Sequence, residues 1–281
     1  MKIDGPTLHL LTLSSLVGFS GGLRLYLAYL LVSEVPKIPL VLAAMLIVYS
    51  TYTLDRSLEN GEDRINRPQL HGADKNTGLI ASGIALLIGI AIFLSEKLIF
   101  LAIFPFAVGF VYSRGIRFRR WQIKLKGGAG LKNLIIGITW GGTIGLLIVA
   151  SGHTGAAMVI CFYFAAKLFI NSTIFDLRDV RGDIAAGIQT LPVWLGEQKV
   201  RYLLFSVCII QHVALAAGMF TRLLGIAVVF LSFSFAASGS VIAFYRVSFE
   251  SDSSWLKRRF RIIMINGEPM ILSVLSIFLP Y

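Results

Sequence analysis

Acidic residues with helical spacing are the first candidates for chemistry in this chain. Asp176, Asp179 and Asp183 follow a long apolar run, and on a helix their i, i+3 and i+7 spacing places three carboxylates along one file. Like charges in a file repel one another, so they are tolerable when Mg²⁺ or a group of Arg and Lys side chains neutralises them. The alternative is a solvated acidic helix end that binds nothing.

A second acid pair lies at the end of another apolar run. Asp55 and Glu59 are four residues apart, so on a helix their carboxylates also share a face. Two acidic files facing each other beside a basic connection would hold Mg²⁺ ions, which in turn would hold a diphosphate. Lys and Arg would then contact the outer phosphate oxygens. The two patterns together predict a site for metal and diphosphate.

Composition determines the class of protein that must position these acids. Of 281 residues, 56% are hydrophobic and only 15% are charged, and the mean hydropathy is +0.77. This excludes an ordinary soluble domain and indicates a polytopic membrane protein. Cys161 and Cys208 lie inside apolar runs and are expected to be packing residues. The net charge of +11 fits cytoplasmic loops and anionic membrane lipids, so no nucleic-acid partner is expected.

Nine apolar runs predict an all-α bundle of nine transmembrane helices. The first is too long for a signal peptide and lacks a cleavage site, so it is expected to be retained. Lys and Arg concentrate in the connections after spans two, four, six and eight. This bias predicts a cytoplasmic N-terminus, an outside C-terminus and cytoplasmic acidic clusters. The nine runs cover residues 8–32, 38–54, 78–94, 98–112, 134–150, 156–175, 202–220, 223–244 and 262–279.

Several polar residues within the predicted spans have open interpretations. Arg24 either extends toward the membrane surface or faces a ligand in the bundle. Glu268 could pair with Arg24 or Lys167, or reach the cytoplasmic edge. Asn171 needs a partner, which could be a bound substrate or another helix.

Two motifs extend the acidic patterns. The D-x-x-D-x-x-x-D sequence at 176–183 continues into Gly-Asp-x-x-x-Gly-x-x-Thr-Leu-Pro, which ends at Pro192, and Asp-Arg-x-x-x-Glu at 55–59 precedes Asn-Arg-Pro at 66–68. With the nine-span plan, these motifs resemble the UbiA-type intramembrane prenyltransferase family. The resemblance covers essentially the whole chain, so residues 1–281 are expected to form one domain. Gly-Leu-Lys-Asn-Leu at 130–134 is similar to the family's fourth connection.

The first motif departs from the family pattern. The family's N-D-x-x-D-x-x-x-D falls here on Thr51, Tyr52, Asp55 and Glu59, so the Asn and the first Asp are lost. Thr51 could still offer an oxygen to a metal. The inserted acids at 62 and 63 could replace the lost charge. The departure puts one Mg²⁺ site in question.

The resemblance implies Mg²⁺-dependent transfer of a polyprenyl group from its diphosphate to an aromatic or other lipid-precursor acceptor within the membrane. Departure of the diphosphate would leave an allylic cation, which an aromatic face can stabilise. Tyr112 is the candidate for that role, and the alternative is a tyrosine of the interfacial belt. The resemblance assigns the metal to Asp55, Glu59, Asp176, Asp179 and Asp183, with Thr51 as a further candidate. By family position the diphosphate is assigned to Arg67, Lys126 and Lys132, and the other candidate substrate contacts are Asn133, Asn171 and Arg24.

Two other functions remain open at this point. A catalytically weakened member of the family would bind or carry a prenylated lipid, and only the altered first motif favours it. An unrelated transporter would explain the charges at Arg24, Lys167 and Glu268, although the chain shows no internal repeat that would favour one.

Overall fold

The computed structural model describes residues 4–58, 66–114, 116–118, 121–123, 128, 130–225, 228–244 and 255–277. The chain divides into two compact units. Unit 1 comprises Met1–Gly22, Lys37–Gly128 and Arg181–Ile188, and unit 2 comprises Leu23–Pro36, Ala129–Val180 and Gln189–Tyr281. We describe each unit by itself.

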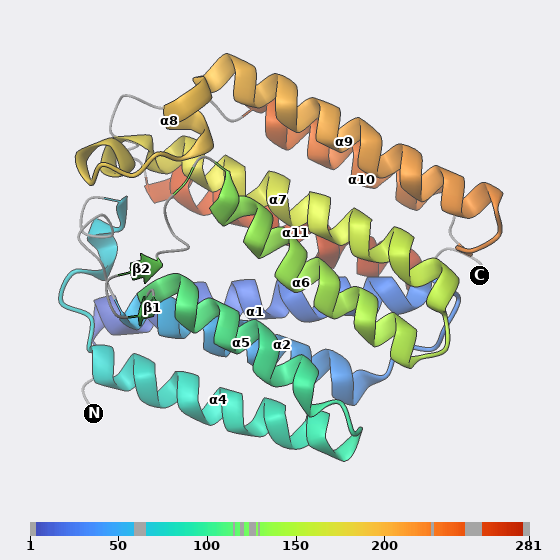
Figure 1. Ribbon diagram of the computed structural model, residues 1–281, viewed down its shortest axis with the longest axis horizontal. Coiled ribbons are helices and arrows are strands. Elements are labelled where there is room, and N and C mark those ends of the chain that lie inside the picture. Colours follow the sequence, from blue (N-terminus) through green and yellow to red (C-terminus); the bar gives the residue numbers. More distant parts are fainter. Residues whose placement is uncertain are drawn as a thin grey trace. The chain divides into compact units, whose positions relative to one another are not determined.

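Unit 1 is built mainly from apolar helices that follow one another along the chain. Helix α2 packs against both α4 and α5, and α4 also contacts α5 (Figure 1). Asp74 caps α4 through a 3.0 Å hydrogen bond that its carboxylate accepts from the Asn76 N–H. The bounds are α1 (Gly5–Leu31, of which unit 1 holds the part up to Gly22), α2 (Ile38–Ser57), η1 (Pro68–Leu70), α4 (Lys75–Ser95) and α5 (Ile99–Arg114).

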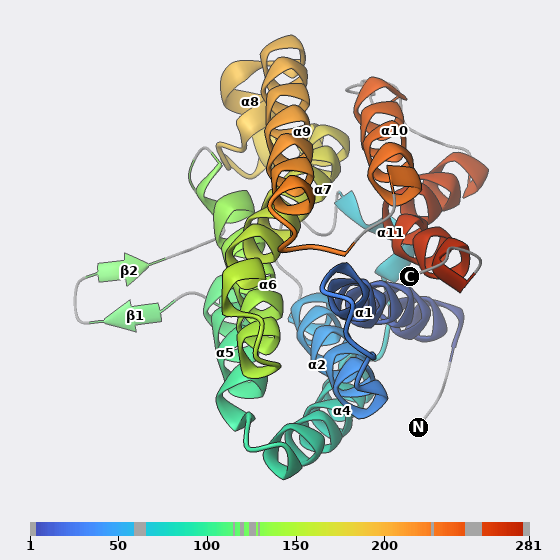
Figure 2. The same ribbon diagram turned by 90° about the vertical axis from the view of Figure 1, so that its right-hand side faces the viewer.

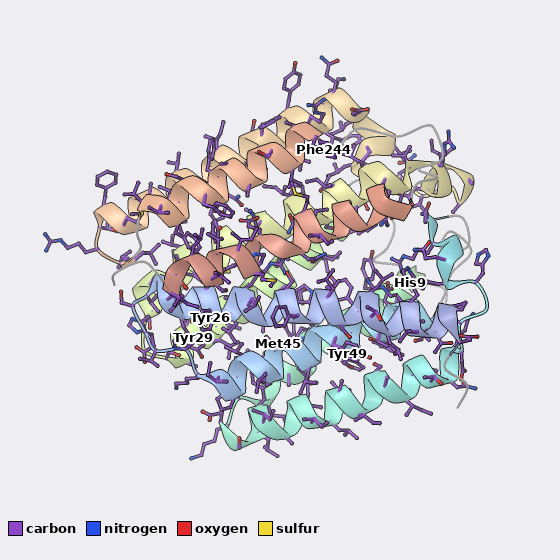
Figure 3. The ribbon with its side chains drawn as sticks, turned by 180° about the vertical axis from the view of Figure 1, so that it is seen from behind. His9, Tyr26, Tyr29, Met45, Tyr49 and Phe244 are labelled. Carbon is purple, nitrogen blue, oxygen red and sulfur yellow. The ribbon has the colours of Figure 1, made fainter. Side chains whose placement is uncertain are left out.

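Small and polar residues bring the helices of unit 1 close together. A Cβ at Gly18 of α1 would lie 2.8 Å from the carbonyl oxygen of Met45 on α2, so only glycine allows this approach. Figure 3 labels Met45 on α2. Between α2 and α4, the Ser50 hydroxyl donates to the Ser82 carbonyl oxygen at 2.7 Å. Close backbone contact and interhelical hydrogen bonds hold such helices together where lipid removes the hydrophobic driving force.

A short β-hairpin also belongs to unit 1. Strands β1 (Ile116–Phe118) and β2 (Trp121–Ile123) run antiparallel, with Phe118 opposite Trp121 (Figure 2). The bundle itself is all-α, as predicted, whereas this hairpin in the connection after α5 was not expected. The physical reason is that isoleucine and aromatic residues alternate with polar ones at 116–123, a pattern that favours paired strands.

Unit 2 contains the other helices. Helix α9 packs against α8 and α10, and α10 packs against α11 (Figure 1). Their buried apolar side chains, together with those of α7, form a core that includes Ile174, Leu204 and Val241. The bounds are α6 (Leu131–Ala150), α7 (Thr154–Ala185, assigned to unit 2 up to Val180), α8 (Leu191–Leu195), α9 (Glu197–Phe220), α10 (Val228–Phe244) and α11 (Trp255–Ile277).

Helix α7 is longer than the span predicted at 156–175, because it continues through the acidic motif. It ends where Gly187 adopts a left-handed φ of 68°. The N–H of Ile188 then bonds the carbonyl of Asp183 at 2.8 Å, and the N–H of Gly187 bonds that of Ile184 at 3.1 Å. This pair of hydrogen bonds is a Schellman motif, which satisfies the last carbonyls of the helix. All three acids of the motif therefore lie on one helix, as their spacing predicted.

A glycine stripe packs α6 against α7. Gly137, Gly141 and Gly145 repeat every four residues, and a Cβ at Gly141 would lie 2.5 Å from the backbone nitrogen of Ala165. At Gly145 the added atom would lie 2.7 Å from the Cβ of Cys161. Small residues at this spacing let two membrane helices touch along their backbones. The stripe therefore brings the backbones of α6 and α7 together between Gly137 and Gly145.

The helices are suited to a membrane. Within the described ranges, six of them (α1, α2, α4, α6, α7 and α9) are long and apolar enough to cross one, and shorter apolar helices cover Ile99–Ser113, Val228–Phe244 and Ile263–Ile277. Each predicted apolar run coincides with one of these helices. The prediction of a helical, multi-pass membrane protein is confirmed, whereas the count of nine crossings and their orientation stay predictions. Cys161 and Cys208 are free thiols.

Candidate functional site

Asp176 is the most buried acid of the second motif. Its relative exposure is 0%, and both of its oxygens accept hydrogen bonds from the first turn of α6. The Lys132 ammonium lies 2.5 Å from Oδ1, and the Asn133 amide donates to Oδ2 at 2.8 Å. Asn133 also donates to the Ser172 hydroxyl at 3.1 Å. Burial of a carboxylate is costly unless charge and hydrogen bonds compensate it, and these partners supply both.

The loop before α6 explains how Lys132 and Asn133 reach this position. Gly130 has a left-handed φ of 84° and precedes the first turn of the helix. A Cβ at Gly130 would lie 3.0 Å from the side chain of Leu191. Glycine is therefore favoured twice at this position, by its backbone conformation and by its close packing. The Gly-Leu-Lys-Asn segment therefore begins α6 so that Lys132 and Asn133 reach Asp176 of α7.

Asp179 is held by its own neighbour in the sequence. The Arg178 guanidinium contacts both carboxylate oxygens, with Nε 2.5 Å from Oδ1 and Nη2 2.7 Å from Oδ2. The same guanidinium lies over the ring of Phe175, 5.2 Å from its centroid. A two-pronged contact of this kind is the strongest geometry for an Arg and carboxylate pair.

Asp183, in unit 1, is reached by Asn66 of the Asn-Arg-Pro motif. The Asn66 amide nitrogen lies 3.4 Å from Oδ1 of Asp183. A Cβ at Gly182 would lie 2.1 Å from the Asn66 side-chain oxygen, so any larger residue at Gly182 would displace that amide. The Gly-Asp pair of the motif thus makes room for a residue 117 positions away in the sequence.

Asp55 of the first motif contacts a serine and an arginine of unit 1. The Ser113 hydroxyl donates to Oδ1 at 2.8 Å, and the Arg67 guanidinium lies 3.6 Å from Oδ2. Arg67, which was predicted to bind the diphosphate, therefore lies beside Asp55 within unit 1. The Thr51 hydroxyl, a predicted metal ligand, donates to the Ile47 carbonyl at 2.9 Å.

The structure gives the positions of other predicted site residues, and their roles stay predictions. Tyr112 is half-buried on α5. Arg24 on α1 and Asn171 on α7 are buried, with 6% and 8% exposure. The Asn171 amide nitrogen has no hydrogen-bond partner among the described residues. Glu59 and Lys126, and the inserted acids at 62 and 63, lie outside the described residues.

The acidic side chains of the two motifs are held by separate basic or polar partners. In the part of the chain that the structure describes, no group of three Asp, Glu, His or Cys side chains is placed so that it could hold a metal ion. Each of the four acids discussed above instead contacts a basic or polar side chain. Arg178 and Ser113 are contacts that the sequence reasoning missed. The signal for Arg178 was its position directly before Asp179 in the motif.

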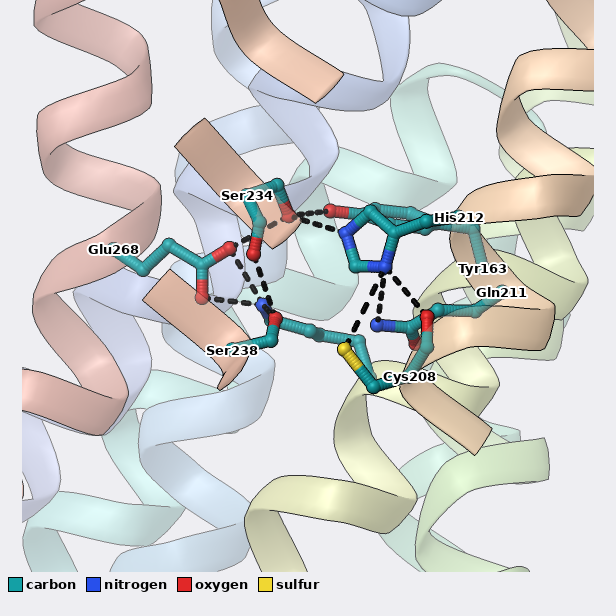
Figure 4. Close-up of polar contacts among 8 residues, drawn as sticks. Tyr163, Cys208, Gln211, His212, Ser234, Ser238 and Glu268 are labelled. Carbon is teal, nitrogen blue, oxygen red and sulfur yellow. Dashed lines mark hydrogen bonds and ion pairs between the residues drawn. The ribbon is translucent and has the colours of Figure 1, made fainter. Parts of the chain in front are cut away.

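A second polar cluster lies deep among the helices of unit 2. The Lys167 ammonium on α7 contacts both oxygens of Glu268 on α11, at 2.6 Å and 2.5 Å (Figure 4). Of the partners considered for Glu268, the structure selects Lys167. Lys167 also donates to the Ser238 hydroxyl, and the Ser234 hydroxyl donates to Glu268 at 2.9 Å.

Histidine and tyrosine extend this cluster. His212 Nε2 lies 3.2 Å from the Ser234 oxygen, and the Tyr163 hydroxyl lies 2.6 Å from it (Figure 4). Ser, His and Glu together suggest a hydrolase, but a catalytic triad places the histidine between serine and acid. Here Ser234 lies between His212 and Glu268. The contacts are those of a polar network that joins α7, α9, α10 and α11.

The comparison with protein families identifies the chain. The model of the UbiA prenyltransferase family matches residues 15–265. The chain belongs to this family. Its helical membrane architecture and the acidic motif on α7 are thus features of a UbiA protein.

Curated relatives of this chain are named digeranylgeranylglyceryl phosphate synthases. The chain is 32% identical over 140 residues to digeranylgeranylglyceryl phosphate synthase of Halobacterium salinarum, a match that covers 49% of each chain. It is 27% identical over 206 residues to the protein of the same name from Thermococcus gammatolerans, covering 69% of this chain and 68% of that one. The match therefore spans about half the length of the first relative and about two thirds of the second.

Solved structures share the fold of this UbiA protein. A UbiA homologue from Archaeoglobus fulgidus bound to GPP and Mg²⁺ has a TM-score of 0.61 at 12% identity, covering 95% of this chain and 99% of that one. A structure from work on digeranylgeranylglyceryl phosphate synthase in membranes has a TM-score of 0.58 at 17% identity, covering 96% and 93%. At these identities the likeness establishes the fold alone.

Proposed function

We propose that this UbiA protein is a Mg²⁺-dependent prenyltransferase that moves a polyprenyl group from its diphosphate to a lipid precursor built on glyceryl phosphate. The observation that carries the proposal is the cluster at Asp176, where a fully buried carboxylate accepts from Lys132 and Asn133. It lies on the helix that bears D-x-x-D-x-x-x-D. Membership in the family supports the reaction class.

The chemistry of the donor set fits Mg²⁺. The motif acids offer only carboxylate oxygens, which hard divalent cations prefer, and neither His nor Cys lies among them. The buried carboxylate of Asp176 is held against a cationic side chain, which is the kind of partner that a metal ion could replace. We assign the metal to Asp55, Asp176, Asp179 and Asp183, and to Glu59 outside the described residues.

Basic residues are assigned to the diphosphate. Arg67 and Lys132 already lie at acids of the two motifs, and Lys126 is a third candidate outside the described residues. When bound, Mg²⁺ supplies positive charge to the departing diphosphate. The role of the two basic side chains is to bind the outer phosphate oxygens and to orient the donor.

The prenyl group that leaves the diphosphate is expected to contact other residues. Breaking the bond between the allylic carbon and the diphosphate oxygen leaves positive charge on the prenyl group. We assign its stabilisation to the ring of Tyr112 through cation–π attraction. Asn171, whose buried amide nitrogen has no hydrogen-bond partner in the described ranges, is a candidate contact for a substrate, as is Arg24.

The sequence prediction left aromatic and lipid-like molecules open as the acceptor. The names of the curated relatives describe a glyceryl phosphate that carries two geranylgeranyl groups. We therefore propose a prenylated glyceryl phosphate as the acceptor in place of an aromatic one. We further propose that residues 1–281 form one domain with nine crossings, a cytoplasmic N-terminus and cytoplasmic acidic motifs.

The test is product formation by the purified protein in lipid nanodiscs. Geranylgeranyl diphosphate would be supplied with geranylgeranylglyceryl phosphate or 4-hydroxybenzoate, with and without Mg²⁺. We expect a Mg²⁺-dependent product with the first acceptor and its loss in Asp179→Asn, which keeps the shape of the side chain and removes its charge. Glu96→Gln, at the exposed C-terminal cap of α4, is the matched control and should remain active.

The alternative is a catalytically weakened protein that binds or carries a prenylated lipid. The observation that favours this alternative is that Thr51, at the family's Asn position, donates its hydroxyl to the Ile47 carbonyl. If the protein bound geranylgeranyl diphosphate but released no diphosphate with any acceptor, the prenyltransferase proposal would fail. The transporter hypothesis has less support, because Lys167 and Glu268, two of its three charges, neutralise each other.

A further inference from the structure

Arg178 holds the carboxylate that the proposed reaction needs. Its Nε and Nη2 contact the two different oxygens of Asp179, at 2.5 Å and 2.7 Å. The side chains of Arg178 and Asp179 are 25% and 13% exposed. A metal ion would compete with the guanidinium for the same oxygens.

The geometry of this pair is unusual for adjacent helical residues. Side chains at i and i+1 point about 100° apart around the helix axis, so such neighbours do not normally face each other. Arg178 reaches Asp179 by lying across the ring of Phe175, with 5.2 Å between the guanidinium carbon and the ring centroid. Phe175 lies about one turn before Arg178 on α7, so its ring supports the guanidinium and stabilises the positive charge.

Asp176, the preceding acid of the motif, is also paired with a cationic side chain. Lys132 lies 2.5 Å from Oδ1 of Asp176, so two successive acids of the motif within unit 2 each hold a cationic side chain. These cations could also bind phosphate oxygens, and Arg is suited to do so through two parallel hydrogen bonds. A divalent metal that takes the carboxylates would release the basic groups.

We propose that Arg178 is an exchange residue: it neutralises Asp179 before the metal binds, and metal binding frees its guanidinium for the diphosphate. The inference rests on the proposed function and goes beyond it, because it links the affinities for the two ligands. A residue that opposes the metal and favours the anion makes their binding positively cooperative. The metal alone should therefore bind weakly, and the diphosphate should bind as its metal complex.

The test measures ligand binding without turnover. Mn²⁺ serves as the probe for the metal, titrated by electron paramagnetic resonance on protein in nanodiscs of zwitterionic lipid. Inorganic diphosphate is then titrated at saturating Mn²⁺. The variants are Arg178→Met, which keeps an unbranched stem and removes the guanidinium, and Arg181→Met, which removes the same charge from an exposed position on the same helix.

We expect Arg178→Met to bind Mn²⁺ about three- to tenfold more tightly than Arg181→Met, since an Arg and carboxylate pair of this exposure contributes modestly. Its affinity for the diphosphate complex should fall about tenfold or more. Arg178→Lys keeps the charge but loses the two-pronged contact. It should restore most of the diphosphate affinity, which a merely structural arginine would not predict.

Two outcomes would overturn the inference and separate it from the proposed function. Equal Mn²⁺ affinities in Arg178→Met and Arg181→Met would refute the exchange alone, provided that Asp179→Asn still weakens Mn²⁺ binding. If the unaltered protein bound no Mn²⁺, the metal assignment would fail and the exchange with it. Thermal unfolding of each variant confirms that the compared proteins are folded.

Discussion

The buried ion pair of Lys167 and Glu268 offers the most quantitative prediction about this protein. The side chains are 6% and 7% exposed, and the ammonium lies within 2.6 Å of both carboxylate oxygens. At an effective dielectric constant of about 20, opposite charges at this separation attract by about 6 kcal/mol. Desolvation costs several kcal/mol for each ion, so the net contribution of the intact pair is small.

Removing one partner is a different perturbation from removing both. Lys167→Met leaves the Glu268 carboxylate buried with a hydrogen bond from Ser234 and no cation among the contacts described here. We expect either Lys167→Met or Glu268→Gln to lower the free energy of unfolding by about 3–5 kcal/mol. The double variant Lys167→Met, Glu268→Met should be destabilised by less than either single variant, because no charge remains buried.

The assay is thermal unfolding in detergent, followed by tryptophan fluorescence. With a shift of roughly 2–4 °C per kcal/mol, each single variant should lose at least about 6 °C in melting temperature, and the double variant should recover at least half of that loss. Ser238→Ala removes a hydroxyl to which Lys167 donates and serves as a milder control. Additive losses in the double variant would refute the reasoning, since they would mean that the two charges do not interact.

Three further predictions follow from other contacts. Gly182→Ala should reduce turnover at least tenfold with little change in melting temperature, because the added Cβ would lie 2.1 Å from the Asn66 side chain; unchanged turnover would show that this contact is dispensable. Lys132→Met should lower both turnover and stability, by about 3–5 kcal/mol for the latter, because it leaves Asp176 buried without its cation; unfolding and product assays measure both. The Thr77 hydroxyl and the backbone N–H groups hold the pKa of the Asp74 carboxyl below its ordinary value of 3.8. A lowered folded-state pKa means that this stabilisation is complete above about pH 4 and is lost as the pH falls through the lowered value. Asp74→Ala should therefore reduce the melting temperature at pH 6, and the difference should shrink in acid; a difference independent of pH would contradict the role of the charge.

The membrane architecture was predictable because its determinants are local. Apolar runs such as 38–54 and 134–150 are long enough to satisfy their own backbone as helices in lipid. The spacing of Asp176, Asp179 and Asp183 needed only the 3.6-residue period, and α7 carries all three. The hairpin at 116–123 was not predicted, because each strand has only three residues and so short an alternation is not distinguishable from a loop.

The sequence by itself therefore determined the class of protein, the positions of its helices, the helical file of acids on α7 and the resemblance to the family. Only the tertiary structure decided the partners: Asn66 for Asp183, Lys132 and Asn133 for Asp176, and Lys167 for Glu268. The physical reason is that helical periodicity is fixed by neighbours in the chain, whereas these pairs join residues 43 to 117 positions apart. Their meeting depends on close helix contacts, such as the glycine stripe of α6 against α7, that no single segment encodes.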